Sequence, residues 1–352
     1  MDFYSSNYRN YVFLPLFFLV VFLLIIFVYP GLKLGIDLKG GTNIIVRADT
    51  PFDVKPLITK LNQKFSLSDL QVTSIQGPNG NGIFIQFSQE NTLAQAKNML
   101  DLSKKNLESN PAEAKRLSLE SIKYSASFLN ETPKQDFSSE KELYEYASSL
   151  FAKAENHFDL SLQQIIKETY GLQSDLKYQK TQVGPTLGKE FYNASLAALF
   201  LGLLFLSIVI IIYFREILTA ATIIAAAIFN ILGSLALMSI FGINVSLTTI
   251  PALLMIIGYS VDSEIVVSAR VLKRKEESAR KRLLDSIKTI LTMSFTAIAA
   301  VTSLVVFSYF SQISVLFEIS IVLLFGLLAD ILSSTMLNAP FILAKAEKEE
   351  KV

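Results

Sequence analysis

Residues 192–213 read YNASLAALFLGLLFLSIVIIIY, an apolar stretch without a charged side chain. A helix needs about 20 predominantly apolar residues to cross the hydrocarbon core of a bilayer. Similar stretches recur along the chain, and together they predict six membrane-spanning helices in a one-plus-five layout. The block of five spans residues 192–343, and the long polar segment before it, residues 30–191, predicts a soluble domain. The other five stretches are residues 11–29, 217–241, 246–267, 290–309 and 314–343.

The composition agrees with an integral membrane protein. Of the 352 residues, 51% are hydrophobic and 18% are charged, and the charges lie mostly outside the apolar stretches. A net charge of +1 argues against a general nucleic-acid binder, which needs a basic surface. The absence of cysteine excludes thiolate nucleophiles and thiolate metal sites. We therefore expect no metal, no cofactor and no enzymatic activity.

The connection between the fourth and fifth spans is strongly basic, with eight Lys or Arg residues against three acids. Short basic connections of membrane proteins lie in the cytoplasm, so we expect this connection there. Contact with anionic lipid head groups also suits it, and a dedicated partner site is the alternative. The residues are Arg270, Lys273, Arg274, Lys275, Arg280, Lys281, Arg282 and Lys288, against Glu276, Glu277 and Asp285.

The remaining connections indicate the same orientation. Arg215, between the second and third spans, falls on the side of the basic connection, whereas the uncharged residues 242–245 fall on the other side. We therefore expect a multi-pass protein of the cytoplasmic membrane, with residues 1–10 and the tail at 344–352 in the cytoplasm. The domain at 30–191 is then extracytoplasmic.

The soluble domain is predicted to combine strands and helices. Runs of β-branched residues predict strands, and an amphipathic pattern predicts a helix after the first of them. This strand-helix-strand-strand order begins a ferredoxin-like α+β fold. Residues 92–171 are rich in Lys, Glu, Ala and Leu at helical spacing, which predicts an α-helical insertion of about three helices. The expected elements are strands at 42–48, 70–76, 83–88 and 175–182 and a helix at 53–65.

Three acidic residues lie within the apolar stretches: Asp262 and Glu264 in the fourth and Asp330 in the sixth. An aspartate at mid-helix costs about 2.5–3.5 kcal/mol on insertion scales, so such residues mark functional sites. Because no Lys, Arg or His lies in any predicted span, the acids must be protonated, hydrated or hydrogen-bonded. Asp262 and Glu264 are about 200° apart around a helix, so only one of them can face a given seam. Possible hydrogen-bond partners are Asn230, Ser234, Ser294 and Thr296.

Two interpretations of these acids stay open. An unpaired buried carboxyl is a candidate for proton handling, and a neutral carboxyl can also serve as a structural hydrogen-bonding group between helices. Depth favours Asp262 and Asp330 as the proton-handling residues. Glu264 is a third candidate, although its position lies closer to the cytoplasmic interface and within reach of water.

Three short motifs flank the soluble domain and occupy the fourth span. They are GIDLKGGT at 35–42, with Gly35, Asp37, Gly40 and Gly41; VGPTLG at 183–188, with Gly184, Pro185 and Gly188; and GYSVD at 258–262, with Gly258, Tyr259 and Ser260, followed by Arg270. These motifs, in this arrangement, resemble the SecF family of protein-export membrane proteins, which belongs with SecD in the resistance-nodulation-division superfamily. The resemblance does not cover the helical insertion.

The resemblance implies an auxiliary subunit of the Sec protein translocation machinery, with no catalytic residue of its own. Such a subunit pairs with a SecD-like membrane subunit, associates with the translocon channel and contacts the translocating polypeptide late in export. The alternative is a transporter component of the same superfamily that acts on lipids or small amphiphiles. Since the chain carries one copy of the six-span unit, and such units commonly occur in pairs, we expect a second chain as its partner.

The fourth and fifth spans depart from the bacterial SecF pattern. Ser263 stands where bacterial members carry an acid, and Phe295 stands where they often carry an arginine. These departures suggest an archaeal-type branch. Coupling to the proton gradient would then need a substitute site, which we expect at Asp262 and Asp330.

Overall fold

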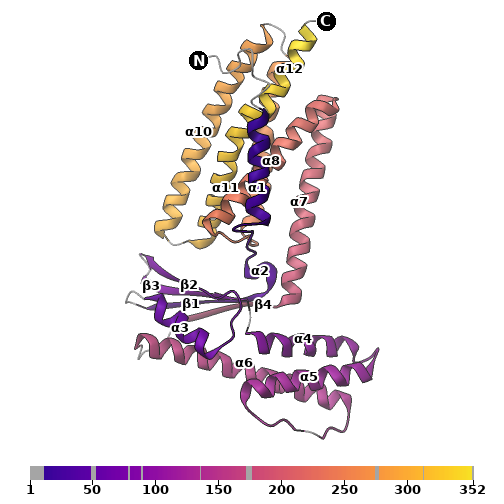
Figure 1. The fold of residues 1–352 in the computed structure, drawn as a ribbon, viewed down its shortest axis with the longest axis vertical. Helices are drawn as coiled ribbons and strands as arrows, with labels where there is room; N and C mark the ends of the chain where they lie inside the picture. Colours follow the sequence, from indigo (N-terminus) through magenta and orange to yellow (C-terminus); the bar gives the residue numbers. More distant parts are fainter. Residues whose placement is uncertain are drawn as a thin grey trace. The chain divides into compact units, whose positions relative to one another are not determined.

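The computed structural model of the chain (Figure 1) describes residues 12–48, 53–77, 80–88, 90–134, 136–171, 177–273, 277–311 and 313–350. The chain divides into two compact units. The membrane unit comprises residues 1–38 and 187–352, and the α+β unit comprises residues 39–186.

The membrane unit is built from long apolar helices. Within the described ranges, five helical stretches are long and apolar enough to cross a bilayer, and the last of them runs without a break over Ser314–Glu350. Helix α1 is apolar but shorter, and Tyr11 at the start of its predicted span lies outside the described residues. The elements are α1 (Phe13–Phe27), the short α2 (Ile36–Lys39), α7 (Pro185–Phe214), α8 (Ile217–Phe241), α9 (Thr249–Lys273), α10 (Ala279–Ser311), α11 (Ser314–Leu332), the π-helix η2 (Ser333–Asn338) and α12 (Ala339–Glu350).

The helices on either side of the basic connection are longer than the apolar stretches within them. Arg270 and Lys273 form the last turn of α9, where cations stabilise the negative end of the helix dipole. Helix α10 begins at Ala279 and takes in the basic residues up to Lys288. Hydropathy marks only the part of a helix that matches the hydrocarbon core, so it predicts a loop where the structure has polar helical turns.

Helices α8, α9 and α11 form the centre of the membrane unit. In the most apolar segments of these helices, 44–56% of the residues are buried, against 11% in those of α7 and α10. Close contact of α11 with its two neighbours depends on glycine. A Cβ on Gly233 of α8 would come 2.7 Å from the Cβ of Ala329, and one on Gly326 would overlap Ile256 of α9. The exposed apolar faces of α7 and α10 are suited to lipid or to another membrane helix.

The segment that follows α1 is tied to the connection between α8 and α9. The Gly35 N–H donates to the Val245 carbonyl at 2.7 Å, and the Val245 N–H donates to the Lys33 carbonyl at 2.8 Å. A Cβ on Gly35 would come 3.2 Å from both the Val245 oxygen and the Ser246 Cβ. Asp37, next in the motif, is half-buried beside the Leu247 backbone, and this burial raises its pKa above the usual value. We name these contacts the Gly35–Val245 clip.

We expect Gly35→Val to destabilise the membrane unit by about 1–3 kcal/mol, because the larger side chain must push the two segments of the clip apart. Thermal unfolding of the detergent-solubilised protein would measure the effect. Gly184→Val is the matched control, because a Cβ on Gly184 meets no atom within 4 Å. Equal melting temperatures for the two variants would contradict a packing role for Gly35.

The α+β unit contains a four-stranded antiparallel sheet in the order β2-β3-β1-β4 (Figure 1). In the central strand, Ile44 pairs with Ile85 of β3 and with Lys180 of β4. One face of the sheet is buried under helices α3 and α6, with Leu57 and Leu162 among the buried contacts. Its elements are β1 (Gly41–Ala48), α3 (Val54–Lys64), β2 (Gln71–Gly77), β3 (Gly80–Phe87) and β4 (Lys177–Val183).

Three helices stand between β3 and β4 in the chain. They are α4 (Asn91–Asn106), α5 (Pro111–Leu129) and α6 (Glu140–Tyr170). Side chains cap each start: Glu90 accepts from the Leu93 N–H, Asn110 from the Glu113 N–H and Ser139 from the Glu142 N–H. Helices α4, α5 and α6 share one hydrophobic core, whose members include Leu100, Ile122 and Leu143.

Candidate functional site

The acids of the membrane helices differ sharply in exposure. Glu264 on α9 is fully buried and Asp330 on α11 is 2% exposed, whereas Asp262 is exposed on the outside of α9. The opposite facing of Asp262 and Glu264 follows from their two-residue spacing on a helix. The structure therefore brings Glu264 and Asp330 into the same helix core and leaves Asp262 outside it, although depth in the sequence favoured Asp262.

Asp330 lies where α8, α9 and α11 meet. The Asn230 side chain of α8 donates from Nδ2 to Asp330 Oδ1 at 2.8 Å and to Ser260 Oγ at 2.8 Å. The Ser263 hydroxyl of α9 donates to Asp330 Oδ2 at 3.3 Å. Of the predicted partners, Asn230 thus contacts Asp330. Ser234 donates to the Val322 carbonyl instead.

Glu264 is held by the π-helical turn that follows α11. Ser334 donates to Glu264 Oε1 at 3.0 Å, and the Asn338 amide donates to Oε2. Asp330, Ser334 and Asn338 stand four residues apart and so share one face, and π-helical turns often occur at functional sites. We name these residues the intramembrane polar cluster: Asn230, Ser260, Ser263, Glu264, Asp330, Ser334 and Asn338.

The cluster contains no cation. In the described part of the chain, neither acid of the cluster forms an ion pair, and the nearby basic side chains are engaged elsewhere. Arg270 donates to the Thr289 hydroxyl at 2.8 Å, and Lys345 pairs with Glu216. No group of three His, Cys, Asp or Glu residues with metal-binding geometry occurs in the described residues. The described residues of the cluster are therefore two carboxyls with amide and hydroxyl partners.

Both amides in the cluster keep a spare acceptor. Asn230 Oδ1 and Asn338 Oδ1 are buried without a hydrogen-bond partner among the described residues. A charged carboxylate accepts from an amide NH₂, whereas a neutral carboxyl carries an O–H that needs an acceptor. A half-turn of either amide would offer its oxygen to a protonated acid. The cluster can therefore satisfy its acids both with and without a proton.

A small apolar hollow leads to Asp330 from the exposed side of α9 and α11. It contains about 180 Å³ of empty space, open solvent included, and Tyr259 is one of its lining residues. The partial exposure of Tyr259, at 44%, makes the hollow reachable from the surface of the unit. Its lining residues are Ile256, Tyr259, Ser260, Leu323, Gly326, Leu327 and Asp330.

The glycines and the proline of the motifs lie at turns, at the ends of strands and in helices. Gly40 has φ +84° at the turn that leads into β1, a conformation that favours glycine, and Gly41 begins the strand. Gly184 follows β4, and Pro185 is the first residue of α7, a position that proline favours. Gly188 is buried within α7 and Gly258 is exposed on α9.

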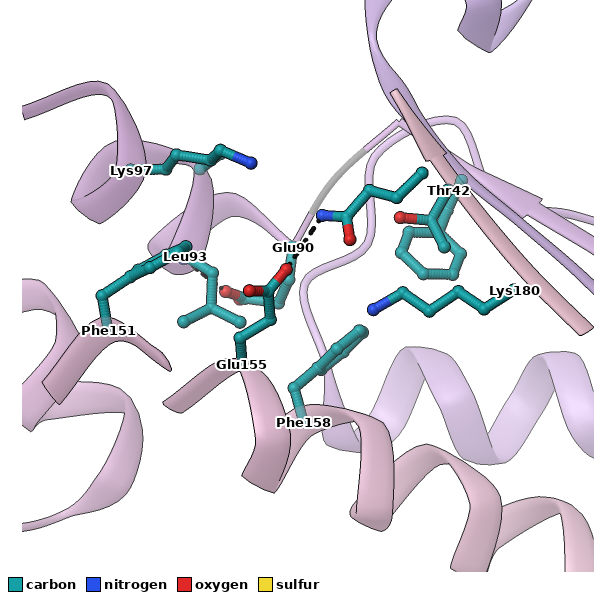
Figure 2. Close-up of a pocket in the computed structure, with 11 residues that line it drawn as sticks. Thr42, Glu90, Leu93, Lys97, Phe151, Glu155, Phe158 and Lys180 are labelled. Carbon is teal, nitrogen blue, oxygen red and sulfur yellow. Dashed lines mark hydrogen bonds between the residues drawn. The ribbon is translucent and has the colours of Figure 1, made fainter. Parts of the chain in front are cut away.

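A second pocket lies in the α+β unit, between the sheet and helices α4 and α6 (Figure 2). It contains about 400 Å³ of empty space, including its open mouth, and has Phe151 and Phe158 among its walls. Glu155 accepts from Gln182 at 3.0 Å, and Lys180 pairs with Asp159 at 2.7 Å. Sequence patterns gave no sign of this pocket, because it forms only where the inserted helices pack on the sheet.

The family models match both ends of the chain. The model described as protein export membrane protein SecD/SecF, C-terminal, matches residues 162–348, and the SecD/SecF GG motif matches residues 25–51. The two matches leave residues 52–161, with helices α4 and α5, uncovered.

Curated relatives are SecF proteins, several of them archaeal. The protein-export membrane protein SecF of Pyrococcus furiosus is 38% identical over 179 residues, which cover 50% of this chain and 60% of that protein. SecF of Methanocaldococcus jannaschii is 38% identical over 182 residues, or 51% of this chain and 64% of that protein. The chain thus matches these relatives over less than two thirds of their length.

Solved structures share the fold. The translocon-associated membrane protein SecDF from Thermus thermophilus aligns with a TM-score of 0.60 at 18% identity, over 97% of this chain and 38% of that one. SecDF in its super-membrane-facing form aligns with a TM-score of 0.53 over 99% of this chain and 40% of that one. The C-terminal SecD/SecF model matches more than half of the chain. This multi-pass membrane protein therefore belongs to the SecD/SecF protein-export family.

Proposed function

We propose that the protein is a SecF-like auxiliary subunit of the Sec machinery, which acts with a SecD-like membrane subunit to promote late export of polypeptides across the cytoplasmic membrane. The SecF relatives and the family match over α7–α12 support this function. The alignment with less than half of the SecDF chain supports a partner that supplies a second membrane unit.

We further propose that six helices, α1 included, cross the membrane and that the α+β unit is extracytoplasmic and ferredoxin-like. The strand order β2-β3-β1-β4 supports this fold type. The basic residues at the end of α9 and the start of α10 support a cytoplasmic position for those helix ends. Both termini would then lie in the cytoplasm.

We base the proposal of proton coupling on the intramembrane polar cluster. Two buried carboxyls without a cation repel each other when both are charged, so a proton shared within the cluster stabilises it. The spare amide oxygens of Asn230 and Asn338 give this proton an acceptor. Uptake and release of the proton would change the hydrogen bonds that join α8, α9 and α11.

This site differs from the one expected from the sequence. The pair proposed here is Glu264 with Asp330, because the Asp262 side chain points out of the helix core. Phe295, at the place of the bacterial arginine, is 61% exposed on α10 and takes no part in the cluster. The hydroxyl of Ser263 remains at the site as a donor to Asp330.

The α+β unit is proposed to contact the translocating polypeptide, and the pocket in Figure 2 is the place that suits such a contact. Aromatic walls with Glu155 and Lys180 at the pocket fit a side chain with an apolar stem and a polar end. The helices that form one wall of this pocket are largely outside the family matches.

Copurification tests the function. We expect the protein, extracted from its native membrane in mild detergent, to recover a SecD-like subunit and the translocon channel. We also expect its depletion to slow the release of exported proteins in a pulse-chase assay. Recovery of the protein alone with bound lipid, and unchanged export on depletion, would favour the lipid or amphiphile transporter instead.

A further inference from the structure

The pocket of the α+β unit (Figure 2) has an aromatic interior. Phe87 of β3 and Phe158 of α6 meet edge to face, with ring centroids 5.9 Å apart and an angle of 77° between the rings. Both side chains are buried, and Phe151 of α6 and Leu93 of α4 complete the apolar wall. The interior therefore suits an aromatic ring, because such rings prefer edge-to-face contacts with one another.

The pocket forms where helices α4 and α6 pack on one row of the sheet. Gln182 of β4, Thr42 of β1 and Phe87 of β3 are direct neighbours across the three strands, so their side chains share one face. Phe151 and Glu155 stand one turn apart on α6 and complete the lining from the helix side. Helix α4 lies outside both family matches, so the pocket depends on the insertion.

The charged groups deep in the pocket already have partners. Lys180 donates from Nζ to both carboxylate oxygens of Asp159, at 2.8 and 2.7 Å. Glu90 accepts from the Leu93 N–H at the start of α4, at 2.8 Å. A charged side chain that entered the pocket would lose its water without gaining a free counter-charge, which is costly. The interior therefore selects an uncharged side chain.

Two partly exposed groups of the pocket keep unused hydrogen-bonding capacity. Lys97 of α4 forms no hydrogen bond or ion pair with another described residue, and Glu155 of α6 is bonded through one oxygen, to Gln182 at 3.0 Å. A polypeptide backbone carries an N–H and a C=O in every residue except proline. It can therefore donate to Glu155 and accept from Lys97 while a side chain fills the pocket.

The strand beside the pocket is open to an added chain. Strand β4 is an end strand and pairs only with β1 among the described strands. An extended polypeptide can add to such an edge, with alternate side chains directed to one face of the sheet. Side chains on the face of Lys180 and Gln182, which line the pocket, would point toward it.

We propose that this pocket binds one Phe or Tyr side chain of an unfolded segment, whose backbone runs beside β4. The inference rests on the proposed function, because the segment belongs to the translocating polypeptide. An aromatic side chain buries about 150–250 Å², and the pocket, with about 400 Å³ of empty space including its open mouth, has room for one. The hydroxyl of a Tyr would stay near the polar groups of the mouth.

The choice of an aromatic side chain gives the pocket a means to distinguish unfolded from folded polypeptides. Large apolar side chains are mostly buried in folded proteins, so an unfolded segment is what presents them to the pocket. When the exported protein folds, it buries the same side chain and leaves the pocket. The pocket thus holds a chain that has emerged and releases it once the chain has folded.

Peptide binding to the full-length protein in detergent tests the residue class. Labelled unstructured peptides, identical except for Tyr, Leu or Ser at the central position, are compared by fluorescence anisotropy. We expect the Tyr peptide to bind about threefold more tightly than the Leu peptide and about tenfold more tightly than the Ser peptide. Equal affinities, or a preference for Leu, would overturn the proposal.

Filling the pocket tests its position. Ala94 of α4 lines the pocket, so Ala94→Leu places extra atoms inside it, while Gln95→Leu adds an apolar side chain at the neighbouring exposed position. We expect Ala94→Leu to weaken binding of the Tyr peptide about tenfold and Gln95→Leu to leave it unchanged. Wild-type affinity in a folded Ala94→Leu protein would contradict the proposal. The peptide comparison needs no substitution in the protein, so it decides the question if Ala94→Leu does not fold.

Crosslinking to an exported protein that is stalled during translocation separates this proposal from the proposed function. A photoreactive side chain at Lys97 should form adducts with the stalled polypeptide. One at Lys105, which is exposed about two turns further along α4, should not. A lipid adduct, or no polypeptide adduct, at Lys97 while the SecD-like subunit copurifies would overturn the pocket proposal and leave the proposed function intact. If the wild-type protein recovered no SecD-like subunit, the proposed function would fail instead.

Discussion

Cells that carry only the Asp330→Asn variant are expected to lose the part of export that depends on the proton gradient, by about tenfold or more. Asparagine keeps the size of the side chain and can still contact Asn230 and Ser263, which bond Asp330 in the wild type. It cannot take up or release a proton. The amount of protein in the membrane should therefore stay unchanged.

Pulse-chase of a secreted protein, with and without an uncoupler, measures this effect. The control is Glu318→Gln, on the same helix but in contact with Ser246 in the connection between α8 and α9, at 3.1 Å. Glu318→Gln should keep the wild-type response to the uncoupler. If Asp330→Asn did so as well, Asp330 would be a structural hydrogen-bonding group and the coupling proposal would fail.

The two buried acids should act as one unit. Residues that perform one step together give effects that do not add. We expect Glu264→Gln to slow export as Asp330→Asn does, and the double variant to be no slower than either single variant. Additive defects would indicate two independent roles and would contradict a shared proton.

Gly326→Leu should have the largest effect on folding, with little or no folded membrane unit recovered. Even a Cβ at this position overlaps the Ile256 side chain, and overpacking in a core costs ~1–3 kcal/mol or more. The added atoms would separate α9 from α11 and break the intramembrane polar cluster. Size-exclusion chromatography of a fluorescent fusion in detergent would report the loss.

Gly258→Leu is the matched control for this experiment, because it lies on α9 yet faces open space. In the chain expressed alone, it should elute as the wild type does. Normal elution of Gly326→Leu would show that α9 and α11 can separate without loss of the fold. It would also remove the packing argument for the cluster.

The sequence predicted most of the helices and strands but only part of the site. Long apolar runs marked helices such as α8, and β-branched runs marked β1, because both signals are local. The choice between Asp262 and Glu264 is not local. Spacing showed that they face opposite ways, and depth favoured Asp262 as the buried acid. Only the packing of α11 against α9 shows that Glu264 faces the core.

The partners of Glu264 do have a signal in the sequence. Asp330, Ser334 and Asn338 recur every four residues, which places three polar groups on one helix face. In an apolar stretch, such a row predicts a buried polar seam. The pocket of the α+β unit had no equivalent signal, because its lining residues come from β1, β3, β4 and two inserted helices.

The Gly35–Val245 clip links the position of α9 to the segment after α1 within the membrane unit. Its backbone bonds hold the segment after α1 against the residues that lead into α9, and α9 carries Ser263 and Glu264. Gly41, where β1 begins, follows shortly after the clip along the chain. A tilt of α9 would strain the two backbone bonds of the clip and displace the segment after α1.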